Sequence, residues 1–128
     1  MGWLLDTNVV IDAFAGQPAA VRALAKARST SVDWVGFSAM TRLEVLGFRG
    51  LSAADEKGLR ELLGQFREVP ISPEIIDEAI RIRREAAIKI PDAIIAATAL
   101  VQNVAVVTRN VTDFRKVSGL QIIDPQTQ

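Results

Sequence analysis

The sequence predicts an α/β fold in which helices cover both faces of a mainly parallel sheet. Short apolar runs typical of buried strands alternate along the chain with segments whose apolar residues recur at helical spacing. Such alternation favours βαβ units, which place strands parallel and helices on both faces. The chain has 128 residues, 49% of them hydrophobic, so we expect a single domain over 1–128 with its own core.

The N-terminal part of the chain begins with a strand and two helices. Trp3-Leu4-Leu5 is a short apolar run that the turn-forming residues Asp6-Thr7-Asn8 bring to an end. Residues 8–14 are expected to form a short helix. Pro18 suits the first turn of a second helix, expected over 18–28, whose apolar residues recur at helical spacing.

The middle of the chain is expected to contain a strand over 34–37, two helices and a brief strand over 69–71. Ser38 is a good N-cap for the first of these helices, because its side chain can accept a hydrogen bond from a free backbone N–H. Ser52 begins the second helical pattern. Both helices carry Leu, Val or Phe at helical spacing, which indicates that one face of each is buried.

The C-terminal part is expected to begin with a long helix that Ser72-Pro73-Glu74 starts and that runs into Arg83-Arg84-Glu85. Pro91-Asp92 opens a further helix over 93–102. This helix is almost wholly apolar and is therefore expected to be buried. Shorter elements are expected near the end: a strand over 104–107, a helix over 113–116 and a strand over 120–123.

Three residue types are missing from the chain: Cys, His and Tyr. Their absence excludes disulfides, thiolate or histidine metal sites, and nucleophilic schemes that pair Ser or Cys with His. It also excludes acid–base catalysis by histidine. An enzyme with this sequence must therefore use Asp, Glu, Lys, Arg, Ser or Thr, and clustered carboxylates favour Mg²⁺ or Mn²⁺.

The charge of the chain is balanced, with 15 basic and 15 acidic residues. A neutral total counts mildly against an extended basic surface for nucleic acid. The balance changes if four acids surround metal ions, because 11 acids then face 15 bases and the remaining surface is net positive by four.

Neither a secretion signal nor a membrane span is expected. The first five residues have no basic leader and are followed by an acid, Asp6. No apolar run approaches the roughly 20 residues that a membrane-spanning helix needs. We therefore expect a cytoplasmic protein without membrane association.

Three polar clusters follow the expected strands: Asp6-Thr7-Asn8, Ser38 leading to Glu44, and Thr108-Arg109-Asn110 leading to Asp113. In parallel sheets, ligands gather beyond the carboxyl ends of the strands. Asp92 stands at the start of the apolar helix, where an unpaired buried carboxylate would be costly. A divalent cation would satisfy several of these acids at once.

Each of these acids also has a purely structural explanation. Asp6 or Asp113 can cap a helix, and Glu44 follows Thr41 at the spacing of a capping box. Asp92 is an acid in a first helical turn, where the helix dipole favours it. Considered singly, the structural explanation is the more common one; considered together, the acids indicate a shared site.

Four motifs occur in order along the chain: LDTNVVI over 5–11, SAMTRLE over 38–44, PDAIIAATA over 91–99 and VTRNVTDF over 107–114. Together they resemble the successive motifs of the PIN domain, and the resemblance covers residues 3–123. The small size of the chain also resembles that of VapC-type toxins of toxin–antitoxin pairs. The resemblance implies a three-layer α/β/α sandwich around a central, mainly parallel sheet.

The resemblance also implies which residues form the site. Asp6, Glu44 and Asp92 match the family's acids, as catalytic residues and metal ligands, and Asp113 is assigned as the fourth. Asn110 occupies a nearer position in the last motif, so whether Asn110 or Asp113 completes the site is open. The resemblance further implies that polar groups support the acids or face the substrate, namely Asn8, Thr108, Asn110 and Arg109.

The implied activity is that of a metal-dependent endoribonuclease, which hydrolyses phosphodiester bonds of RNA with one or two Mg²⁺ or Mn²⁺ ions. Two ions about 3.5–4 Å apart would activate water, orient the phosphate and neutralise the leaving oxygen. Its implied partners are RNA, a cognate antitoxin and a second copy in a homodimer. Five apolar residues could lie either in the core or at an exposed groove or dimer seam, and core packing is the more common explanation for any one of them: Val9, Val10, Phe14, Phe48 and Leu51.

Basic residues near the motifs are candidate phosphate contacts. Arg109 is the one we favour, and a second cluster precedes Asp92 at the end of the long helix: Arg81, Arg83, Arg84 and Lys89. Solvated helix surface explains that cluster equally well.

Two other functions compete with the ribonuclease. A catalytically silent PIN-like module could bind RNA without cleaving it, although three matching acids argue against it. A magnesium-dependent phosphatase or a receiver domain also places an Asp after the first strand. Asn8 stands where such a phosphatase needs a second Asp, and Arg109 is the only base where a receiver domain needs a lysine.

Overall fold

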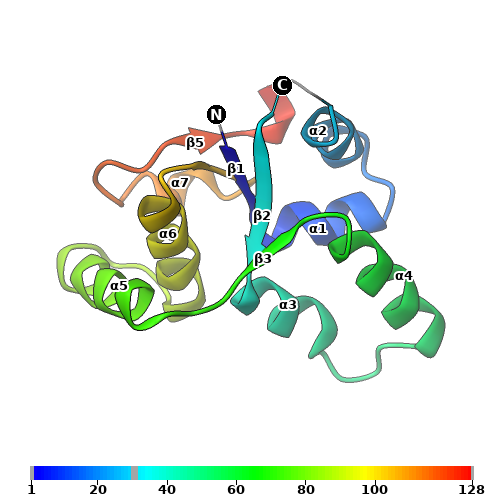
Figure 1. Ribbon diagram of the computed structural model, residues 1–128, viewed down its shortest axis with the longest axis horizontal. Coiled ribbons are helices and arrows are strands. Elements are labelled where there is room, and N and C mark those ends of the chain that lie inside the picture. Colours follow the sequence, from blue (N-terminus) through cyan, green and yellow to red (C-terminus); the bar gives the residue numbers. More distant parts are fainter. Residues whose placement is uncertain (1, 30–31, 128) are drawn as a thin grey trace.

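The computed structural model describes residues 2–29 and 32–127 (Figure 1). Its strands are β1 (Gly2–Leu5), β2 (Trp34–Ser38), β3 (Arg67–Val69), β4 (Ala105–Val107) and β5 (Ile122–Ile123). Its α-helices are α1 (Thr7–Phe14), α2 (Pro18–Ala27), α3 (Ala39–Leu46), α4 (Ala53–Leu63), α5 (Pro73–Glu85), α6 (Ile90–Gln102) and α7 (Val111–Phe114). A 3₁₀ helix, η1 (Pro125–Thr127), follows β5.

The five strands form one sheet in the order β3-β2-β1-β4-β5, and every neighbouring pair is parallel. β1 lies at the centre, where Trp3 pairs with Val35 of β2 and with Ala105 of β4. All four residues of β1 are buried, as a strand covered on both faces requires. The predicted parallel sheet is therefore confirmed.

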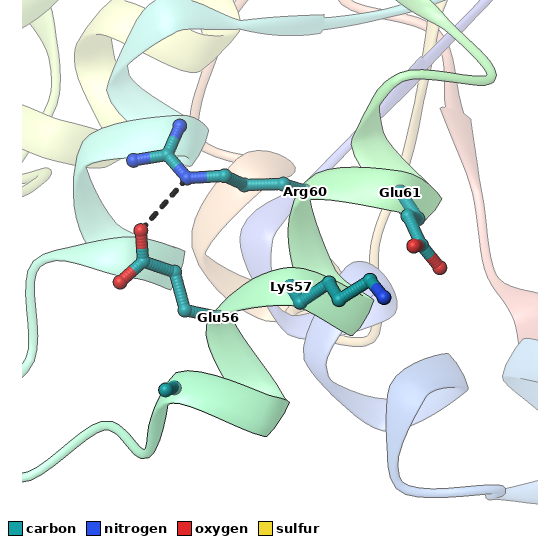
Figure 2. Close-up of a pocket in the computed structure, with 5 residues that line it drawn as sticks. Glu56, Lys57, Arg60 and Glu61 are labelled. Atoms are coloured by element: carbon teal, nitrogen blue, oxygen red, sulfur yellow. Dashed lines mark hydrogen bonds and ion pairs between the residues drawn. The ribbon is translucent and has the colours of Figure 1, made fainter.

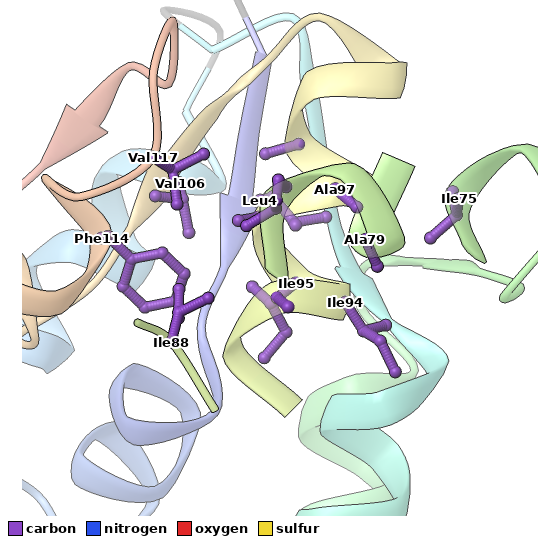
Figure 3. Packing of buried hydrophobic residues seen from close by; sticks show 14 of the residues in the cluster. Leu4, Ile75, Ala79, Ile88, Ile94, Ile95, Ala97, Val106, Phe114 and Val117 are labelled. Carbon is purple, nitrogen blue, oxygen red and sulfur yellow. The ribbon is translucent and has the colours of Figure 1, made fainter. Parts of the chain in front are cut away.

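Helices pack on both faces of the sheet, because successive strand side chains point in opposite directions. Leu4 and Val106 face a core formed with α5, α6 and α7 (Figure 3). Trp3, Leu5 and Val107 face the other way, into a second core formed with α1 to α4. The resulting three layers, visible in Figure 1, confirm the α/β/α sandwich.

Some element boundaries differ from the sequence prediction. The strand expected over 69–71 is β3, over Arg67–Val69, and Pro70 ends it because proline has no N–H for the sheet ladder. β3 is an edge strand, so Arg67 and Glu68 remain exposed within it. The helix expected over 113–116 is α7, which begins at Val111.

Within residues 2–29 and 32–127, no helix is long and apolar enough to cross a bilayer. The most apolar one, α6, has 13 residues and is therefore about 20 Å long, shorter than the roughly 30 Å of a hydrocarbon core. Its apolar surface is used inside the protein, where seven of its residues are buried between the sheet and α5.

Candidate acidic site at the carboxyl edge of the sheet

Asp6 follows the last residue of the central strand and is nearly inaccessible, at 4% exposure. Its backbone N–H donates to Val107 O at 2.9 Å, which ties it to β4. Its carboxylate accepts two hydrogen bonds, from Thr7 N to Oδ1 at 2.8 Å and from the Thr108 hydroxyl to Oδ2 at 2.7 Å. The bond from Thr7 N makes Asp6 the N-cap of α1, so the structural explanation of this residue holds. The bond from Thr108 is not part of the cap and additionally fixes the carboxylate beside β4.

Glu44 projects from α3 toward the start of α1. The Thr7 hydroxyl donates to Glu44 Oε1 at 2.8 Å and lies 3.0 Å from Thr41 Oγ1. The N-cap of α3 is Ser38, whose hydroxyl accepts from Met40 N, so the capping-box explanation of Glu44 is wrong. The contact with Thr7 instead brings Glu44 next to Asp6.

Asp92 lies in the first turn of α6 and is half-buried. Burial raises the pKa of its carboxyl group, and the negative charges of Glu44 and Asp113 raise this pKa further. The Lys89 ammonium opposes them and lowers the pKa of Asp92. Asp92 therefore lies in the electrostatic field of two acids from other segments of the chain.

Asp113 lies inside α7, whose N-cap is Asn110. Its Oδ2 accepts from Asn110 Nδ2 at 3.0 Å, and its Oδ1 is 3.3 Å from the Lys116 Nζ. These two contacts lower the pKa of Asp113. Both residues that could complete the site are thus in direct contact, with Asp113 providing the charge and Asn110 the hydrogen bond.

The four acids affect one another electrostatically. Burial raises the pKa of Asp6 to about 6, and the charges of Asp92 and Glu44 raise it as well, against the hydrogen bonds from Thr108 and Thr7. In the part of the chain that the structure describes, no three acidic side chains lie close enough together to bind one ion. The acids thus share one edge of the sheet without forming a closed cluster.

Thr108 connects several of the remaining site residues. Its hydroxyl is completely buried, and besides donating to Asp6 it accepts from Asn110 N at 2.9 Å and from Asn8 Nδ2 at 3.4 Å. Asn8 Oδ1 in turn accepts from Arg109 N at 3.2 Å. All four polar residues predicted from the sequence therefore belong to one hydrogen-bond network that includes Asp6.

Arg109 forms an ion pair with Asp12, a residue that the sequence analysis did not identify. Its Nε donates to Asp12 Oδ2 at 2.9 Å, so the guanidinium lies along α1 while remaining 55% exposed. Thr7 and Thr41, which contact Glu44, were also missed. A signal was present for Asp12, because it lies one helical turn after Asn8 and so on the same face of the first helix.

Two residues of the basic cluster at the end of α5, Arg81 and Arg83, make local contacts. Arg81 pairs with Glu78 and Glu85 of its own helix, and Arg83 Nη1 donates to Ile88 O at 2.8 Å. Lys89 is the member that lies near the acids, since its charge acts on Asp92 and Asp113.

Another hollow in the surface lies on α4 and includes none of the four acids. Figure 2 shows this hollow, lined by two acids and two bases, in which Arg60 Nε donates to Glu56 at 2.9 Å. Neither sign of charge is concentrated there, so the hollow has no property of an ion or phosphate site.

Five apolar residues were expected either in the core or at a groove or dimer seam. Val9 and Val10 lie in the core, whereas Phe14 and Phe48 are 40% and 57% exposed and Leu51 is half-buried.

Comparisons with known proteins agree with the fold. The model of the PIN domain family matches residues 3–120. A chain of a toxin–antitoxin complex from Klebsiella pneumoniae is 33% identical, with a TM-score of 0.82 over 97% of this chain and 98% of that one. A chain of FitAcB from Neisseria gonorrhoeae is 26% identical, with a TM-score of 0.79 over 98% and 99%.

A chain of VapBC2 from Rickettsia felis, in a structure with a DNA fragment from the promoter, has a TM-score of 0.84 at 19% identity and supports the fold alone. It is covered over 98% of its length, and this chain over 96%. Comparison with curated proteins gave no match. The predicted resemblance to PIN-domain proteins of toxin–antitoxin systems is confirmed.

Proposed function

The chain belongs to the PIN-domain family, and on that premise we propose that it is a metal-dependent endoribonuclease and the toxin of a toxin–antitoxin pair, acting in the cytoplasm. The proposed catalytic residues are Asp6, Glu44, Asp92 and Asp113. The observation that carries the proposal is the gathering of these acids from four separate segments at one sheet edge, where Asp92 and Glu44 help to raise the pKa of Asp6 to about 6.

The donor set fits a hard divalent cation. Carboxylate oxygens are the groups that Mg²⁺ and Mn²⁺ prefer, and neighbouring carboxylates that repel one another gain from a shared positive charge. The proposed ligands do not yet surround a common point, so binding requires side chains to turn inward. Glu44 is exposed and Asp92 half-buried, which leaves room for that movement, whereas buried Asp6 is fixed by its hydrogen bonds.

When bound, the cation would supply the Lewis acid that activates water and stabilises charge on the phosphate. The chain's own residues would prepare the site. The Thr108 hydroxyl and Thr7 N–H hold the Asp6 carboxylate in one orientation. Lys89 and Lys116, whose charges act on Asp113, would attract the RNA backbone toward the acids, so RNA affinity should fall with salt.

The test is cleavage of a mixed RNA pool by the purified chain with Mg²⁺ or Mn²⁺. We expect cleavage that EDTA abolishes and that Asp92→Asn lowers by about 100-fold or more, because the neutral amide weakens ion binding without changing side-chain volume. Glu61→Gln, which removes an exposed acid on α4, is the matched control and should cleave normally.

A second measurement separates ion binding from catalysis. Mn²⁺ should raise the melting temperature of the wild-type chain and of Glu61→Gln, because an ion that binds only the folded state stabilises it. Asp92→Asn should show a smaller rise. Full RNase activity in folded Asp92→Asn, or cleavage that persists in EDTA, would contradict the proposed mechanism. A wild-type chain that binds RNA without cleaving it would favour the alternative, a catalytically silent PIN-like module.

The proposed antitoxin partner would cover the exposed apolar side chains on the α1–α4 side. Phe14, Leu43 and Phe48 are 40%, 65% and 57% exposed, so a partner protein that covers them would remove apolar surface from water. We expect Leu43→Glu to weaken capture of the protein encoded by the neighbouring gene, measured by co-purification, whereas Glu61→Gln should not. Retained capture by Leu43→Glu would place the partner elsewhere.

We also propose that two copies of the chain form a homodimer.

A further inference from the structure

Arg109 is an exposed residue that the structure holds at two points. Its backbone N–H donates to Asn8 Oδ1 at 3.2 Å, and its guanidinium Nε donates to Asp12 Oδ2 at 2.9 Å. Asn8 and Asp12 are four residues apart in α1, so consecutive turns of one helix face hold both ends of the arginine. The side chain of Arg109 is therefore fixed along α1.

Folding stability gives little reason for this arrangement. The side chain of Arg109 is 55% exposed, and an ion pair in contact with water contributes little to the stability of the fold. Holding a long arginine side chain in one position also costs rotamer entropy. The contact with Asp12 is better explained by what the fixed guanidinium can bind.

The guanidinium of Arg109 keeps most of its donors while it is paired. Arginine carries five N–H groups in a planar fork. The contacts with Asp12 use one on Nε, at 2.9 Å, and one on Nη2, at 3.5 Å. Within residues 2–29 and 32–127, the other three have no partner. Two of these three lie side by side on Nη1 and Nη2, a geometry that matches two oxygens of a phosphate.

The loop that carries Arg109 belongs to the acidic edge of the sheet. Arg109 directly follows Thr108, whose hydroxyl donates to Asp6 Oδ2 at 2.7 Å. Lys116 is close to another of the acids, since its Nζ lies 3.3 Å from Asp113 Oδ1. The acidic edge therefore has one positive group along α1 and another just after α7.

We infer that Arg109 binds a backbone phosphate of RNA beside the cleavage point, and that Asp12 is a positioning residue that holds the guanidinium for this contact. This assignment rests on the proposed function, because it names an RNA contact of the same site. The bound group is a phosphodiester anion, for which two parallel N–H groups supply both charge and geometry. Asp12 does not touch the RNA, so its effect passes through Arg109.

Arg60 on α4 provides a matched control (Figure 2). Its Nε donates to Glu56 at 2.9 Å and its side chain is 55% exposed, so this ion pair equals that of Arg109 in distance and in exposure of the arginine. It lies in the hollow that includes none of the four acids. A loss of RNA affinity that is specific to Arg109 is therefore not a general effect of removing an exposed arginine.

The first test is the dissociation constant of a labelled single-stranded RNA of mixed sequence, measured by fluorescence anisotropy in EDTA so that the RNA stays intact. Arg109→Gln should weaken binding by about tenfold and lower the slope of log affinity against log salt by about 0.7, the value for one phosphate contact on a single strand. Arg109→Lys keeps the charge but loses the fork, so it should restore only part of the affinity. Arg60→Gln should bind RNA as the wild type does.

The second test asks whether Asp12 acts through Arg109. Removing an acid near bound RNA would by itself strengthen binding, because one repulsive charge is lost. We expect the opposite: Asp12→Ala should weaken binding by about threefold in the chain that has Arg109, and should not weaken it in the Arg109→Gln chain. Glu56→Ala, the matched control for the acid, should not weaken binding in either chain.

Circular dichroism of each variant separates lost binding from lost folding. If the wild type binds RNA and Arg109→Gln binds it equally tightly, the inference is overturned and the proposed function stands. Full affinity in Arg109→Lys, or tighter binding by Asp12→Ala in the chain that has Arg109, also overturns it. A wild-type chain that binds no RNA contradicts the proposed function together with the inference.

Discussion

Thr108 shows how one side chain can organise a charged site from inside the sheet. It directly follows β4, is completely buried and uses its single hydroxyl to donate to Asp6 and to accept from Asn110 N. The hydroxyl thereby joins the central strand to the loop that leads to Asp113. Its effect on the Asp6 carboxylate is measurable, because this hydrogen bond stabilises the charged form.

We predict that Thr108→Val raises the pKa of Asp6 above its value of about 6 and lowers the free energy of unfolding by about 1–3 kcal/mol. The valine has the same shape but leaves Asp6 Oδ2 and Asn110 N without this partner. A carbon-13 NMR titration of the Asp6 carboxyl group gives the pKa, and denaturant unfolding gives the stability. Thr108→Ser keeps the hydroxyl and should resemble the wild type; an unshifted Asp6 pKa in Thr108→Val would contradict the argument.

At the scale of elements, the contact between β2 and β3 depends on a residue without a side chain. A Cβ built on Gly36 would lie 2.6 Å from Trp34 Cη2 and 2.7 Å from the backbone oxygen of Arg67. The second neighbour belongs to the paired strand and cannot rotate away. Glycine is therefore required here by close approach of two strands.

We predict that Gly36→Ala lowers the free energy of unfolding by about 2 kcal/mol, since β2 and β3 must separate to admit the methyl group. Gly58→Ala is the matched comparison. Its Cβ would lie 2.7 Å from Phe14 Cε1, but that ring is 40% exposed and can move, and alanine favours the helix. Denaturant unfolding should show the larger loss for Gly36→Ala, and equal losses would contradict this account.

The strands, helices and contacts of this fold differ in how far the sequence could predict them. The buried strands and α6 could be predicted, because continuous or almost wholly apolar runs, such as 104–107 and 93–102, have few alternative interpretations. β3 was misplaced toward Ile71 because an edge strand that exposes Arg67 and Glu68 carries little apolar signal. The ordered motifs nominated the acids, but spacing along the chain does not contain the Asp12–Arg109 or Thr7–Glu44 contacts, which join residues 97 and 37 positions apart.

At the scale of the whole molecule, Asp6 links protonation to folding. Its pKa is about 6 in the folded chain against 3.8 for an ordinary aspartate, so the folded state binds a proton more tightly than the unfolded state. The resulting stabilisation is complete below about pH 4 and is lost as the pH rises through about 6. The raised pKa of Asp92 acts in the same direction, and the lowered pKa of Asp113 acts against it.

We predict that the free energy of unfolding in EDTA decreases by about 3 kcal/mol between pH 4 and pH 7 through Asp6, a value that follows from a pKa difference of about 2. Asp6→Asn should remove most of this decrease and should be the more stable protein at about pH 8. Denaturant unfolding across the pH range measures both. A parallel pH profile for the wild type and Asp6→Asn would show that another group is responsible.

The two cores on opposite faces of the sheet have a consequence for how the acids are spaced. Val45 anchors the helix of Glu44 in one core, Ile95 and Phe114 anchor the helices of Asp92 and Asp113 in the other, and Asp6 follows the strand between them. The separation between the carboxylates is therefore set by the thickness of the sandwich. A core substitution that leaves a cavity in either helical layer, even far from any charge, would therefore change the distance between the carboxylates. The geometry of the site thus depends on the packing of the entire protein.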